Sequence, residues 1–63
     1  MLRVTVTEAA LQAGRFRSRS WLAIKAVDWI DCGDVVYFIA RQGHAWQTVR
    51  RVAAEDVAWV EEA

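Results

Sequence analysis

The chain of 63 residues contains no proline, a single cysteine and a single histidine. One cysteine cannot form an intrachain disulfide, and one cysteine with one histidine cannot complete a four-ligand zinc site. We therefore expect a reducing, cytoplasmic setting and no metal ion or other cofactor. A domain of this size buries only about 60% of the surface that its unfolded chain exposes, so marginal stability is expected.

Long apolar segments and linkers are missing as well. No run of about 18 apolar residues is present to span a membrane, and no charged segment at the N-terminus leads into a long apolar one. Repeats, low-complexity tracts and interdomain linkers are also absent from the sequence. These absences predict one soluble domain, residues 1–63, without contact to a membrane.

The net charge is zero, because eight basic side chains balance eight acidic ones. This balance argues against strong non-specific binding to nucleic acid, since affinity for phosphates comes from summed basic charge. The charges are grouped, however, with basic blocks within residues 1–25 and 41–51 and acidic blocks within 28–34 and 55–62. Unless they are solvated or paired with the acidic blocks, the arginines offer a surface to an anionic partner or nucleic acid. The candidate contacts are Arg15, Arg17, Arg19, Arg41, Arg50 and Arg51.

What the chain has in excess is apolar material: 56% of its residues are hydrophobic, and four are tryptophan. Each indole can bury on the order of 200 Å², which a small domain has difficulty hiding. The tryptophans therefore either form the core or line an interface with a second copy or another protein. The candidate interface residues are Trp21, Trp29, Trp46, Trp59 and Tyr37.

The apolar residues are arranged mainly as strands. Apolar and polar residues alternate from Leu2 to Thr7, which is typical of a strand with one wet face. Later apolar runs are separated by polar turns that contain Gly33 and Gly43, as in a meander of hairpins. The run 20–30 is long enough for a helix, but its β-branched and aromatic residues favour a strand. The predicted strands are residues 2–7, 20–30, 34–41 and 45–52.

One of these strands is apolar on both faces, over residues 35–40, which predicts a central position in the sheet. We expect its outer face to be covered by a C-terminal helix at residues 53–62. Ala53, Val57 and Val60 share one face of such a helix, while Glu55, Asp56 and Glu62 lie away from that face. The alternative is a last strand at residues 58–61, pairing with the first strand after a turn.

A short helix is also predicted over residues 8–13. Good helix formers fill this segment, Thr7 can cap its N-terminus, and Gly14 directly follows it.

No group of residues resembles a catalytic or metal site. Asp28, Asp31 and Asp34 recur near a turn, but their spacing fits no calcium loop, so a solvated hairpin turn is the better interpretation. Cys32 lies in the same turn without a base, and three carboxylates nearby disfavour a thiolate. His44 follows a glycine in the second turn and has no catalytic partner beside it. We therefore do not expect an enzyme.

Two family resemblances follow from particular segments. The middle of the chain, with VDW at 27–29, GDVVYF at 33–38 and WQTV at 46–49, is similar to the hairpin meander of Src-homology-3-like barrels. This resemblance implies a fold and no activity.

The two ends of the chain, VTVTEAA at 4–10 and RVAAEDVAWVE at 51–61, resemble winged-helix proteins of the excisionase and MerR-like group. That second resemblance implies a recognition helix at residues 20–31 whose polar face meets the major groove of DNA. Residues 21–27 have almost no polar face.

Together these observations predict an α+β fold that is mostly β. It is a small antiparallel meander or Src-homology-3-like barrel with a short C-terminal helix, and a winged helix is the alternative. The expected function is that of a non-enzymatic binding or assembly module that acts through protein–protein contacts, as a homo-oligomer or with another protein. Its size and style suggest an accessory protein of a bacterial or mobile-element system. The alternative function is a DNA-binding regulator of the excisionase type.

Overall fold

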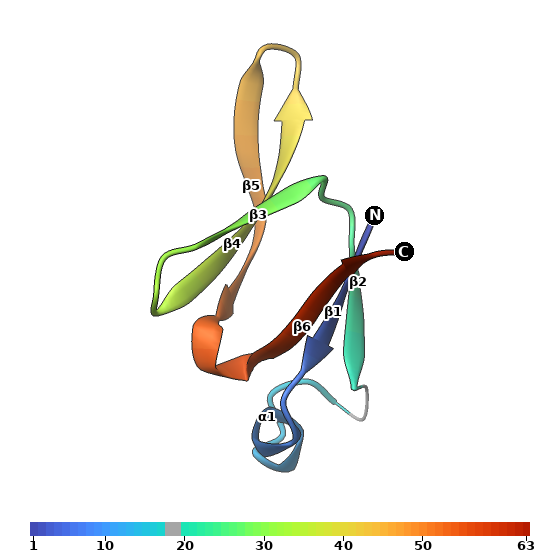
Figure 1. Cartoon of the computed structure of the whole chain (residues 1–63), viewed down its shortest axis with the longest axis vertical. Coiled ribbons are helices and arrows are strands. Elements are labelled where there is room, and N and C mark those ends of the chain that lie inside the picture. The colour runs from blue at the N-terminus through green and yellow to red at the C-terminus, as the bar shows by residue number, and fades with distance from the viewer. Residues whose placement is uncertain (18–19) are drawn as a thin grey trace.

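The computed structural model describes residues 1–17 and 20–63, and strands make up most of them, as the predicted fold class requires. Figure 1 shows the arrangement of the elements in space. In chain order these are β1 (Leu2–Val6), α1 (Glu8–Gln12), β2 (Trp21–Ile24), β3 (Asp28–Asp31), β4 (Val35–Gln42), β5 (Ala45–Ala53), the 3-10 turn η1 (Ala54–Asp56) and β6 (Val57–Glu62).

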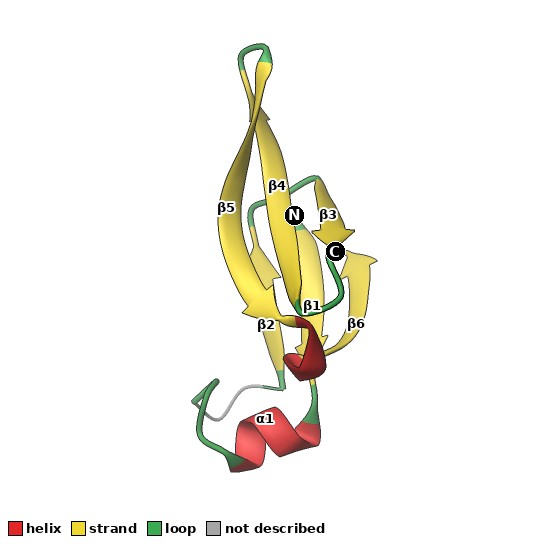
Figure 2. Ribbon diagram, turned by 90° about the vertical axis from the view of Figure 1, so that its left-hand side faces the viewer, coloured by secondary structure: helices red, strands yellow, loops and turns green. Residues whose placement is uncertain are grey.

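The strands form two antiparallel sheets of three strands each. The first sheet has the order β2-β1-β6, and the second has the order β3-β4-β5. The hairpin of β4 and β5 extends beyond both sheets at one end of the molecule, and α1 lies at the other end (Figure 2). Within the described residues no ladder joins the two sheets, so strand pairing does not close a barrel.

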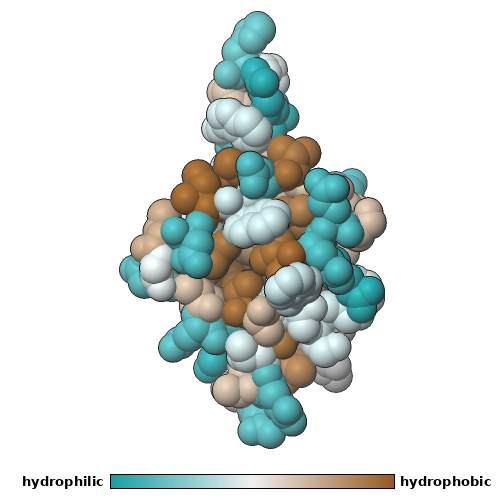
Figure 3. Space-filling view, in the orientation of Figure 1, coloured by the Kyte–Doolittle hydropathy of each residue, from teal (hydrophilic) through white to brown (hydrophobic). Residues whose placement is uncertain are grey.

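The core lies between the inner faces of the two sheets. β1 is the middle strand of its sheet, and its alternation places Leu2 and Val4 inward, 1% and 0% exposed. Phe38 of the second sheet belongs to the same buried cluster and is 0% exposed. Figure 3 shows hydrophobic side chains gathered in the middle of the displayed face and a hydrophilic hairpin tip. The buried cluster consists of Leu2, Val4, Ile24, Ala26, Val36, Phe38 and Val52.

Three of the four predicted strands are confirmed within one residue at each end, as β1, β4 and β5. The central position predicted for residues 35–40 is confirmed too, because β4 lies between β3 and β5. Both hairpins turn where the sequence places a glycine. Gly33 has φ +93° and Gly43 has φ +64°, backbone angles that glycine adopts without the steric cost other residues meet.

The predicted strand at residues 20–30 is correct in type but wrong in extent. It is two strands, β2 in the first sheet and β3 in the second, and only β3 pairs with β4. The chain bends between them where the Ala26 amide donates to the Ile24 carbonyl at 2.8 Å. The recognition helix that the winged-helix alternative places at residues 20–31 is not formed there.

The predicted C-terminal helix at residues 53–62 is wrong. Residues 54–56 form η1, and β6 then pairs with β1, which confirms the alternative of a last strand. A bulge explains the misleading pattern: Trp59 lies opposite Thr5 and Val57 opposite Val6, so Ala58 is an extra residue. The bulge puts Val57 and Val60 on one face although they are three residues apart, which imitates helical spacing. The outer face of β4 is therefore not covered by a helix.

The short N-terminal helix is confirmed as α1. The Thr7 hydroxyl accepts a hydrogen bond from the Ala10 amide at 3.2 Å, as predicted for the N-cap. At the other end the Gly14 amide donates to Leu11 and the Arg15 amide to Ala10, the two bonds of a Schellman motif. This motif directs the chain after α1 back toward the second half of the molecule.

Along the described residues, no helix is long and apolar enough to cross a membrane.

Candidate functional site

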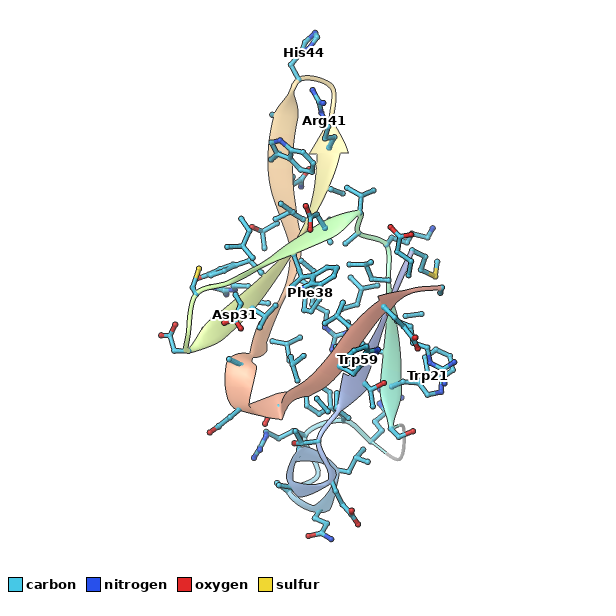
Figure 4. The ribbon with its side chains drawn as sticks, viewed as in Figure 1. Trp21, Asp31, Phe38, Arg41, His44 and Trp59 are labelled. Atoms are coloured by element: carbon cyan, nitrogen blue, oxygen red, sulfur yellow. The ribbon has the colours of Figure 1, made fainter. Side chains whose placement is uncertain are left out.

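The main surface feature is a pair of tryptophans on the outer face of the first sheet. Thr5 of β1 lies directly opposite Trp21 of β2 and Trp59 of β6. Directly opposed residues of antiparallel strands point to the same side, and the neighbours of Thr5 point into the core, so all three point outward. Figure 4 labels Trp21 on β2 and Trp59 on β6. Two strand spacings separate their backbones by about 10 Å.

Charged side chains complete this surface. Arg3 lies two residues from Thr5 on the same face, and its guanidinium carbon is 4.6 Å from the centroid of the Trp21 ring, a cation–π contact. Glu61 of β6 lies opposite Arg3. Trp59 is 63% exposed, more than any other large hydrophobic side chain described, whereas Trp21 is half-buried. We call this surface the tryptophan face, and it consists of Arg3, Thr5, Trp21, Trp59 and Glu61.

The other candidate interface residues lie elsewhere. Tyr37 is half-buried on the outer face of the second sheet, where it lies opposite an exposed Ile30. Trp29 lies opposite Phe38 on the inner side of an edge strand and is 39% exposed. Trp46 is on the projecting hairpin, with the Arg41 guanidinium carbon 5.6 Å from its ring centroid. The five predicted residues therefore do not form one patch.

The tryptophans are not the core of this small domain. Among the described residues, the buried hydrophobic side chains include Phe38 and several aliphatic residues but no tryptophan. Of the two sequence interpretations of the four tryptophans, the core interpretation is therefore wrong.

One of the six candidate arginines makes a specific ion pair. Nε of Arg15 donates to Oδ2 of Asp56 at 3.0 Å, and Nη2 donates to Oδ1 at 2.7 Å. The Asp56 side chain is 4% exposed and that of Arg15 46%. The hydrogen bond to Asp56 raises the pKa of the Arg15 guanidinium above its ordinary value; burial opposes the shift, and the charges of Asp56 and Glu55 reinforce it.

The same arginine lines a hollow of about 350 Å³ at the end of the molecule near α1. Two further arginines, Arg17 and Arg50, also line it, together with the apolar side chains of Phe16 and Leu22. We call this hollow the arginine pocket. Three of the six candidate arginines therefore line one hollow.

The remaining candidate arginines do not join them. Arg41 is on the projecting hairpin, and Arg51 lies opposite Tyr37 on the outer face of the second sheet. Arg19 lies outside the described residues. A second hollow, of about 210 Å³, lies at the opposite end of the first sheet and is lined mainly by apolar residues with Glu62 as its charged side chain.

The polar turns are as solvated as the sequence suggests. Oδ1 of Asp31 accepts a hydrogen bond from the Gly33 amide, and Oδ1 of Asp28 accepts one from the Trp29 amide, both at 2.8 Å. These two carboxylates therefore bind backbone amides of their own turn or strand. Cys32 is exposed, and His44 projects from the hairpin tip (Figure 4). Among residues 1–17 and 20–63 no group of three or more histidine, cysteine or carboxylate side chains is placed to hold a metal ion.

Several residues of these sites could not be identified from the sequence, Arg3, Thr5 and Asp56 among them. The alternation of β1 predicts that Arg3 and Thr5 lie on a solvent-facing side of the strand, and they do. The sequence does not reveal that Trp21 and Trp59 lie on the two neighbouring strands at the level of Thr5. Asp56 was placed on the exposed side of a C-terminal helix, whereas it is 3% exposed. No local signal marks a buried aspartate whose partner is 41 residues away.

Comparisons with known proteins add no relative: no family model matches the chain, and neither do any curated protein or solved structure.

Proposed function

We propose that this chain is a non-enzymatic protein-interaction module that associates with a second copy of itself through the tryptophan face. The observation that carries the proposal is the placement of Trp21 and Trp59 on either side of Thr5, on the outside of the sheet. A pair of tryptophans on an outer strand surface, here an exposed Trp59 and a half-buried Trp21, is the kind of feature that dominates the energetics of protein interfaces.

The size of the exposed surface supports an interface. A folded chain of 7.2 kDa is expected to expose about 4,100 Å². This one exposes 4579 Å². A standard interface covers about 800 Å² per partner, roughly a sixth of that surface. The exposed large hydrophobic side chains are Met1, Val27, Trp29, Ile30, Trp46, Val49 and Trp59.

The shape of the tryptophan face favours a second copy as the occupant. The backbones of Trp21 and Trp59 are about 10 Å apart, and the shorter Thr5 lies between them on the same face, so two large side chains flank a small one. In a twofold dimer, the Trp59 ring of each copy packs over Thr5 of the other. Every such contact is then made twice, which is the commonest way for a small chain to gain burial.

The charges of the face favour the same occupant. Arg3 and Glu61 lie opposite each other, so each copy presents one cation and one anion, and a twofold contact in which each pairs with its opposite on the other copy satisfies both. Because the chain has no net charge, two copies also approach without overall repulsion.

As part of this proposal, the order of elements supports a Src-homology-3-like arrangement in which the two sheets are not joined into a closed barrel. A three-stranded meander, β3 to β5, is followed by a single 3-10 turn and by a last strand that returns to the first. This is the order that the barrel interpretation of the sequence requires. The outer face of β1 then remains free of other elements, as an interface needs.

Sedimentation equilibrium at micromolar concentrations tests the proposal. We expect a species of twice 7.2 kDa for the unmodified chain. Trp59→Ala should give a monomer, because it removes the ring that packs over Thr5 of the other copy. Trp46→Ala is the matched control, because Trp46 is a similarly exposed tryptophan, at 55%, but lies on the hairpin. This substitution should leave the dimer intact.

Two results would overturn the proposal. One is a monomer of the unmodified chain at every concentration, and the other is an equal effect of the two substitutions.

A further inference from the structure

The arginine pocket gathers cations from two distant parts of the chain. Arg15 and Arg17 follow α1, whereas Arg50 lies on β5, and all three line one hollow of about 350 Å³. On β5, Arg50 lies opposite Phe38 and Arg51 opposite Tyr37, so the two consecutive arginines point to opposite sides of the sheet. Only Arg50 of the two is directed to the pocket.

The charge of the pocket is larger than that of a single ion pair. Three guanidinium groups carry +3 and the carboxylate of Asp56 carries −1, which leaves +2 for a ligand. Glu55 is exposed, so water screens its effect, and its influence on Arg15 is the smallest of the contributions. A phosphate monoester, with about −1.5 to −2 charges at pH 7, matches +2 better than a carboxylate does.

Asp56 also holds one of these cations in place before any ligand arrives. Its two oxygens fix Nε and Nη2 of Arg15, and the carboxylate is itself buried. A guanidinium has five N–H donors, so three remain after the two bonds to Asp56. A cation held in one geometry loses less conformational entropy when it binds an anion.

Apolar groups form the rest of the pocket. Phe16 and Leu22 line it and pack against the core cluster, so they are held in position. A bare inorganic ion would leave these side chains exposed to water. A ligand with a ring or an aliphatic group beside its phosphate would cover them.

The backbone at Arg17 is strained. Its φ is +46°, and no other residue except the glycines has positive φ in the described chain. The left-handed conformation is unfavourable for a residue with a Cβ atom, and such strain is found preferentially at ligand sites. Here it coincides with an arginine that lines the pocket from the loop after α1.

We infer that the arginine pocket binds a small phosphate monoester that carries an apolar or aromatic group, with the phosphate on Arg15, Arg17 and Arg50 and the apolar group on Phe16 and Leu22. A nucleic acid strand is a poorer fit, because it needs a continuous track of cations. Arg41 and Arg51 do not extend the pocket: one is on the hairpin and the other is on the opposite side of β5.

The test is a titration of the isotope-labelled chain with phenyl phosphate, followed by amide and arginine side-chain NMR shifts. Trp59→Ala serves as the background, so that self-association and ligand binding are measured independently. Saturable shifts are expected at Arg17 and Arg50 and should weaken as salt is added. Benzoate, with the same ring and one charge, and inorganic phosphate, without a ring, should each bind more weakly than phenyl phosphate.

Substitutions in β5 locate the site. Arg50→Gln should weaken phenyl phosphate binding by about tenfold or more, because a charge-assisted hydrogen bond is lost. Arg51→Gln is the matched control, next in the chain but on the other side of the sheet, and should leave the affinity unchanged. The inference is overturned if phenyl phosphate gives no saturable shift, if benzoate binds equally well, or if the two substitutions have the same effect.

Discussion

Arg15 and Asp56 are 41 residues apart in the chain and form a two-point ion pair around a buried carboxylate. The pair ties the loop after α1 to the 3-10 turn that precedes β6. A backbone bond reinforces the link, because the Thr7 amide donates to the Asp56 carbonyl at 2.9 Å. The contact thus joins the N-terminal third of the chain to its last strand, and it fixes one wall of the arginine pocket.

Asp56→Ala should lower the melting temperature by roughly 5 °C or more, since it removes both charge-assisted hydrogen bonds between Arg15 and the buried carboxylate. Glu55→Ala is the control, because Glu55 is adjacent but exposed and makes no hydrogen bond in the described residues. Thermal unfolding followed by circular dichroism would measure both. Equal melting temperatures for the two variants would mean that the ion pair does not stabilise the fold.

Arg17→Gly should make the protein more stable and weaken its binding of phenyl phosphate. Glycine relieves the strain of a left-handed residue at +46°, and after its own entropic cost a gain of about 0.5–1 kcal/mol is expected. Urea unfolding measures the gain, and the NMR titration measures the affinity. Arg51→Gly, in the regular part of β5, should instead destabilise; a loss of stability at both positions would contradict the assignment of strain.

Cys32→Ser and Gly33→Ala differ sharply in expected effect although they are neighbours in one turn. Cys32 is exposed, so its replacement should change stability by less than about 0.5 kcal/mol and leave any binding intact. Gly33 has φ +93° and open space where a Cβ would stand, so Gly33→Ala should cost about 1–2 kcal/mol for conformational reasons alone. Chemical denaturation distinguishes the two, and a large effect at Cys32 would show that the thiol has a structural role.

Thr5→Arg should break the proposed dimer while the monomer stays folded. The long cation replaces the small Thr5 side chain between the two tryptophans and adds to the charge of Arg3, so two copies would face each other with like charges. Thr48→Arg is the control, because Thr48 is also on a strand but exposed on the outer face of the second sheet. Sedimentation equilibrium should show a dimer for the control alone. Dimers in both variants would place the interface elsewhere.

Local patterns were sufficient for much of the fold. The alternation of residues 2–7 placed Leu2 and Val4 in the core and Thr5 outside, because successive side chains of a strand point to opposite faces. Gly33 and Gly43 marked both hairpin turns for a similarly local reason, since each turn needs a positive φ. The cap of α1 at Thr7 also depends only on residues within one turn of it.

Other features depend on contacts between distant segments, and local patterns misled there. The bulge at Ala58 gave a strand the apolar spacing of a helix, and only its pairing with β1 decides between them. The run 20–30 was divided between two sheets because each half finds a different partner strand, β1 or β4.

The sequence by itself determined the mostly β class of this protein, its turns, and which side chains of β1 face inward, since these follow from neighbours along the chain. Only the tertiary structure decided that Trp21 and Trp59 stand on either side of Thr5, and that Arg50 reaches the pocket of Arg15 while Arg51 does not. The physical reason is register: one residue of shift reverses every side chain of a strand, and register is set by packing across the whole molecule.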